Sequence, residues 1–131
     1  MTVGHLAYLP NSAEAPSIAR RFVRQTLEGW DGNDATDNAA LLTSELVTNV
    51  IRHTSARSTL RVSINRDVVR IEVSDPDRTP LPEPAASRAF GPDGLGLAIV
   101  DRVASNWGVE LVEDGKIVWF EVVPGPRKPI G

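Results

Sequence analysis

Hydrophobic and polar residues alternate along this chain at two different periods. Between Pro16 and Trp30, apolar residues such as Ile18, Phe22 and Val23 recur at helical spacing, with arginines between them. This pattern is typical of an amphipathic helix, and a proline suits its first turn. A second helix is expected from residue 34 or 36, where an aspartate or a threonine can cap it, to about residue 54.

Later stretches have an apolar residue at every second position, which predicts strands. Two such runs, separated by Asn65-Arg66-Asp67, predict a β-hairpin. A second hairpin is expected around Asp114-Gly115, and a short first strand near the start of the chain. The predicted strands are His5–Leu9, Leu60–Ile64, Val69–Val73, Val109–Val112 and Ile117–Val123.

Prolines and glycines interrupt this regular pattern after Asp75. They recur from Pro76 to Gly94 and exclude regular structure there, and long loops in compact domains are usually functional. Helical spacing returns with four apolar residues and ends at Gly108. Those four residues are Leu95, Ile99, Val103 and Trp107. The order of elements is too irregular for repeated βαβ units, so it predicts a two-layer α/β sandwich.

Composition narrows the class of protein further. A length of 131 residues predicts one domain, residues 1–131, with a loose tail at about 124–131. The net charge of −3 argues against a nucleic acid as a direct partner. The absence of cysteine excludes disulfides and thiol nucleophiles and favours a cytoplasmic location. With neither a signal-like start nor a long apolar run, we expect a protein that is not exported and does not span a membrane.

Three polar clusters interrupt the apolar pattern. On the second predicted helix, Glu45 and Asn49 lie one turn apart, which places a carboxylate and a carboxamide on one face. Asp75 ends an apolar strand. The segment Gly94-Leu95-Gly96-Leu97 leads directly into a helix, whose first amides are free to bind phosphate oxygens. The first two clusters each also fit a plain alternative, a solvated helix face and a turn-forming acid. Gly115-Lys116 fits an ordinary hairpin turn.

The three clusters together resemble the GHKL ATPase superfamily, which includes DNA gyrase and sensor histidine kinases. Glu45-Leu46-Val47-Thr48-Asn49 and Gly94-Leu95-Gly96-Leu97 are most similar to motifs of the small bacterial anti-sigma-factor serine kinases. The resemblance extends from the first helix to the last strand. It implies a GHKL-type sandwich, in which a mixed, mostly antiparallel sheet is covered on one face by three helices.

The resemblance also implies roles for individual residues. Glu45 would be the catalytic base, Asn49 would bind Mg²⁺, and Asp75 would recognise the amino group of adenine. The segment Gly94–Leu97 would bring backbone amides to the phosphates of ATP, and residues 75–90 would belong to a lid over the nucleotide. Because an ionised carboxylate only accepts hydrogen bonds, Asp75 predicts that ATP binds in preference to GTP.

The chain departs from the family in two places. Pro76-Asp77-Arg78-Thr79-Pro80 stands where many relatives have glycines, and Ile117 stands where they often have a threonine after Gly-Lys. The leading hypothesis is a cytoplasmic, Mg²⁺- and ATP-dependent protein serine/threonine kinase. It would bind a sigma factor and phosphorylate an anti-sigma-factor antagonist of the STAS type, with homodimerisation left open. The alternatives are a catalytically weak or inactive GHKL scaffold that regulates by binding a protein, and a detached histidine-kinase catalytic domain.

Overall fold

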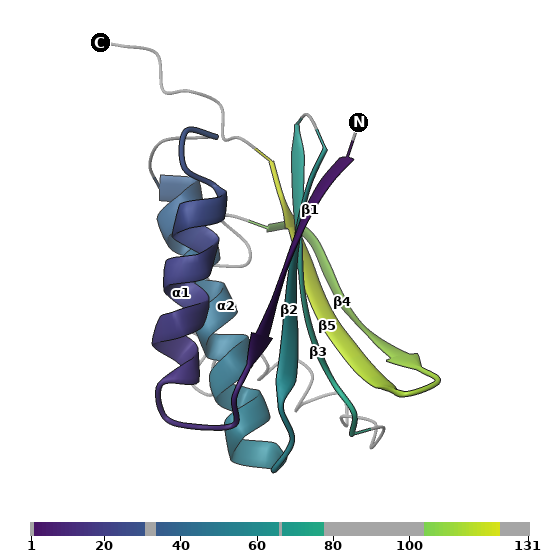
Figure 1. Cartoon of the computed structure of the whole chain (residues 1–131). Helices are drawn as coiled ribbons and strands as arrows, with labels where there is room; N and C mark the ends of the chain where they lie inside the picture. Colours follow the sequence, from purple (N-terminus) through teal and green to yellow (C-terminus); the bar gives the residue numbers. More distant parts are fainter. Residues whose placement is uncertain (1, 31–33, 66, 78–103, 124–131) are drawn as a thin grey trace, which may run out of the picture.

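In the part of the chain that the structure describes, a five-stranded sheet and two helices form two layers, with both helices on one face of the sheet (Figure 1). The computed structural model describes residues 2–30, 34–65, 67–77 and 104–123. The described elements are β1 (Thr2–Leu9), α1 (Ala15–Thr26), α2 (Asp34–His53), β2 (Ser58–Asn65), β3 (Val68–Asp75), β4 (Ala104–Val112) and β5 (Gly115–Val122). The predicted two-layer α/β sandwich is confirmed.

The strand order is β1-β2-β3-β5-β4, and every described pair of neighbours is antiparallel. The expectation of a mixed sheet is therefore not met among these strands. The β2–β3 hairpin and the β4–β5 hairpin both form as predicted, and β5 inserts between β3 and β4.

The core lies between the helices and one face of the sheet. Alternate residues of β3 point into it, and helix α2 contributes residues such as Leu42, Leu46 and Val47. Burying one such side chain contributes roughly 1.5–3 kcal/mol to the stability of the fold. Every second residue of the strands and every third or fourth residue of the helix is therefore apolar and faces the same layer. The largest fully buried side chains include Phe120, Leu9, Leu27, Leu42, Leu60 and Ile71.

The predicted third helix is wrong at its C-terminal end. Residues 104–108 belong to β4, while the rest of that prediction, from Leu95 onward, lies outside the described residues. Trp107 and Val109, two residues apart, both pack against the core, as a strand requires. The pairing of this segment with β5 decides its conformation. The register of the two strands shifts between Ala104 and Asn106, and regular pairing follows from there.

The first predicted helix also ends earlier than expected, at Thr26 instead of Trp30. The Leu27 backbone N–H still donates to Val23 O at 2.9 Å, but Leu27 is the C-cap residue, and Gly29 adopts φ +80° in the turn that follows. At the other end of the chain, β1 begins at Thr2, earlier than the predicted His5. Within the described ranges, no helix combines the length and apolarity needed to cross a membrane.

Candidate functional site

Asp75 is a buried carboxylate at the last position of β3. Because Val69, Ile71 and Val73 are buried on the face of the sheet that packs against the helices, strand alternation directs Asp75 to the same side. Its side chain is 1% exposed. The carboxylate oxygen Oδ1 accepts a hydrogen bond from the Asp77 backbone N–H at 2.9 Å, which turns the chain sharply at the end of the strand.

Lys116 supplies the opposite charge. Its Nζ lies 3.2 Å from Asp75 Oδ1, and its side chain is 8% exposed. The same ammonium donates to the carbonyl oxygen of Asp77 at 3.1 Å. The register of the sheet sets this pair directly opposite, since Asp75 on β3 faces Lys116 on β5. This end of the sheet therefore contains an ion pair that is almost fully shielded from water.

Gly115 allows β5 to start against the end of β3. A Cβ atom added at Gly115 would overlap the carbonyl oxygen of Asp75 and lie 2.8 Å from the Cα of Pro76. Backbone atoms occupy that space, so no side chain can be accommodated without moving the strand end. This close approach holds Lys116 at the carboxylate.

Helix α2 carries the other two predicted site residues. Glu45 and Asn49 are half-buried and lie four residues apart, so their side chains are neighbours on the helix surface beside the core stripe. At 1.5 Å per residue, Asn49 lies about 6 Å and Glu45 about 12 Å along the axis from the helix end at His53. Both residues therefore belong to the C-terminal half of α2.

The C-terminal end of α2 lies at the same end of the molecule as Asp75 (Figure 1). Strand β2 starts at Ser58, shortly after α2 ends, and its register aligns Thr59 with Ser74, next to Asp75. The side chain of Asn11 ties this end together by donating to the carbonyl oxygens of Thr54 at 3.1 Å and Ala56 at 2.8 Å. The fold thus brings the predicted carboxamide and the predicted base-reading carboxylate to one end of the helix–sheet layer.

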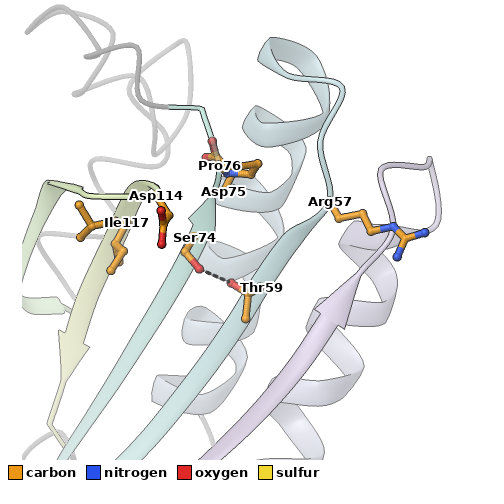
Figure 2. Close-up of a pocket in the computed structure, with 8 residues that line it drawn as sticks. Arg57, Thr59, Ser74, Asp75, Pro76, Asp114 and Ile117 are labelled. Carbon is orange, nitrogen blue, oxygen red and sulfur yellow. Dashed lines mark hydrogen bonds between the residues drawn. The ribbon is translucent and has the colours of Figure 1, made fainter.

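A shallow pocket lies at this end, lined by Asp75 at the end of β3 and by residues on the face of the sheet that points away from the helices (Figure 2). Thr59, Ser74 and Ile117 line it, and the Ser74 hydroxyl donates to Thr59 O at 3.5 Å. These residues alternate with the core residues of their strands, so they point away from the helices. Ile117 therefore lies on the face opposite to the inward-pointing side chains of Asp75 and Lys116.

The predicted phosphate-binding residues Gly94, Leu95, Gly96 and Leu97 lie outside the described residues, as does most of the predicted lid. Within the described ranges, no group of three or more His, Asp or Glu side chains is arranged to hold a metal ion.

The sequence pattern predicts no role for Lys116 or Gly115, because Gly115-Lys116 is typical of an ordinary hairpin turn. One signal was present: Val118, Phe120 and Val122 alternate inward, and extending that period by one step places Lys116 on the buried face.

Comparison with known proteins identifies the family of this chain. Residues 35–126 match the family described as histidine kinase-, DNA gyrase B- and HSP90-like ATPase. The match covers most of the chain, and the protein belongs to this family. No curated protein sequence matched the chain.

Among solved structures, the chain is similar to the catalytic domain of histidine kinase ThkA in a nucleotide-free form. The TM-score is 0.54 at 19% sequence identity, covering 92% of this chain and 97% of that domain. At this identity the likeness concerns the fold alone, and it confirms the GHKL type of sandwich that the sequence motifs predicted.

Proposed function

We propose that this protein is an ATP-dependent serine kinase of the anti-sigma-factor type. The observation that carries the proposal is the buried carboxylate of Asp75, which lies at the same end of the domain as the C-terminal half of α2 in a chain of an ATPase family. The two oxygens of an ionised carboxylate can accept about four hydrogen bonds, so Asp75 can accept one from a ligand besides those from Lys116 and the Asp77 N–H.

The residues have separate roles in this proposal. Asp75 accepts a hydrogen bond from the base of the nucleotide, and Gly94–Leu97 offer backbone amides to the phosphates. Mg²⁺ is usually held by one or two side chains together with phosphate oxygens and water, so the carboxamide oxygen of Asn49 fits as its protein ligand. When bound, the cation would neutralise charge on the phosphates.

Glu45 performs the proton transfer. Its carboxylate takes the proton of the acceptor serine hydroxyl while the serine oxygen bonds to the γ-phosphorus. The bond between the γ-phosphorus and the bridging oxygen breaks, and ADP leaves with that oxygen. Glu45 is half-buried beside Asn49, which keeps the carboxylate accessible to a protein substrate.

The partners follow from the same resemblance to anti-sigma-factor kinases. We propose a sigma factor as the bound protein and a STAS-type antagonist as the serine substrate, in the cytoplasm. Whether two copies of the chain associate is a separate question, which the mass of the purified protein in solution answers.

Two measurements test the function. Calorimetric titration with Mg·ATP tests for saturable binding, and transfer of labelled γ-phosphate to a serine of a STAS-type protein tests for kinase activity. Binding with transfer supports the kinase. Binding of the sigma factor without nucleotide binding or transfer would favour the scaffold alternative, and transfer to a histidine would favour a histidine-kinase catalytic domain.

A further inference from the structure

The carboxylate proposed to read the base is already paired with a cation. Asp75 Oδ1 accepts from Lys116 Nζ at 3.2 Å, and both side chains are almost fully buried. A clear preference for ATP over GTP is expected only where the carboxylate of Asp75 is an isolated acceptor. With Lys116 beside it, the same position offers both an acceptor and a donor.

The hydrogen-bonding capacity of the ammonium group supports this reading. A lysine ammonium has three N–H donors. Within the described part of the chain, two of them are directed at Asp75 Oδ1 and Asp77 O. These two contacts use two of the three donors, which leaves one for a further acceptor such as a ligand atom next to the carboxylate.

The lysine is also fixed in place. Register pairs Lys116 with Asp75 across β3 and β5, and the missing side chain at Gly115 lets the two strands approach at that point. If the buried ammonium moved away from its carboxylate, both charges would be left without a partner and without water, which is strongly unfavourable. The donor and acceptor therefore stay side by side when a base arrives.

We propose that Lys116 determines base specificity by making the site accept purines with either an amino or an oxo group at C6. This inference rests on the proposed nucleotide site at Asp75. An amino group at C6 donates to the carboxylate of Asp75, whereas an oxo group accepts from the ammonium of Lys116. ITP and GTP, both 6-oxo purines, should thus bind with an affinity within about tenfold of that of ATP.

The charge-assisted hydrogen bond sets the size of the effect. Such a bond changes affinity by roughly 10- to 100-fold. Lys116→Met removes the donor and leaves a 6-oxo group facing a carboxylate, so ITP and GTP should lose that factor relative to ATP. The 6-amino group retains its acceptor on Asp75.

The experiment is competition binding of Mg·ATP, Mg·ITP and Mg·GTP to three proteins: the unmodified chain, Lys116→Met and Arg61→Met. Arg61 is an exposed cation on β2, so Arg61→Met serves as the matched control and should leave all three affinities unchanged. Lys116→Met should raise the ratio of ATP affinity to ITP affinity by roughly 10- to 100-fold. An unchanged ratio in a folded variant overturns the inference.

The unmodified protein supplies an independent test if Lys116→Met does not fold. A preference of the unmodified protein for ATP over ITP beyond about tenfold contradicts the expected tolerance and overturns the inference while leaving the nucleotide site intact. If no nucleotide binds to the folded protein, the proposed function fails and this inference fails with it.

Discussion

The buried pair of Asp75 and Lys116 gives the sharpest prediction for stability. Asp75→Ala removes the carboxylate and leaves the ammonium of Lys116 in a site where its side chain is 8% exposed. The ammonium would retain the Asp77 carbonyl oxygen as an acceptor but would lose its counter-charge. The Asp77 backbone N–H would lose its acceptor as well.

The expected loss is about 3–5 kcal/mol in the free energy of unfolding, the range for removing one partner of a buried ion pair. For a domain of this length, 1 kcal/mol corresponds to roughly 4 °C in Tm, so Tm should fall by roughly 12–20 °C. That loss is a large part of the 5–15 kcal/mol that stabilises a typical domain.

Urea unfolding of four proteins measures the pair: the unmodified chain, Asp75→Ala, Lys116→Met and the double variant. The double variant should recover most of the stability, because apolar replacement of both partners removes the unpaired charge along with its counter-ion. An equal slope of the free energy with urea in all four would show that the denatured state is the same.

A loss of less than about 1 kcal/mol in Asp75→Ala, the value typical of solvated surface pairs, would contradict the prediction. Simple addition of the two single losses in the double variant would contradict it as well. If the prediction holds, the role of Asp75 in nucleotide binding is better tested with Asp75→Asn, which retains the shape of the side chain, at a temperature where the variant is folded.

Three further predictions concern the site and its support. Glu45→Ala should lower phosphoryl transfer by roughly 10²- to 10⁴-fold while Mg·ATP binding persists, because only the proton acceptor is removed; an unchanged rate would exclude Glu45 as the base. Gly96→Val should weaken ATP binding in calorimetry without lowering Tm, since a branched side chain blocks close approach of the backbone to phosphate. Gly115→Ala should lower Tm, because its Cβ would overlap Asp75 O; a Tm equal to that of the unmodified protein would show that the strand end can move at little cost.

The sequence alone determined the elements whose periodicity is local and strong. Leu60, Val62 and Ile64 are apolar at every second position, which predicts a strand without knowledge of its neighbours. Successive side chains of a strand point to opposite faces, so these three residues share one face. The stripe of Leu42, Leu46 and Val50 likewise defines α2, which the structure ends at His53, within a residue of the predicted end. The motif of Glu45 and Asn49 on α2, together with Asp75 and Gly94–Leu97, also sufficed to indicate the family.

The tertiary structure decided what depends on pairing between distant segments. Residues 104–108 have spacings compatible with a helix, and only their pairing with β5 makes them a strand, because backbone hydrogen bonds and core packing there exceed a weak local preference. The contact between Asp75 and Lys116 joins residues 41 apart. It exists because β5 inserts beside β3, and strand order is set by the burial of both strands in one core rather than by the local sequence of either.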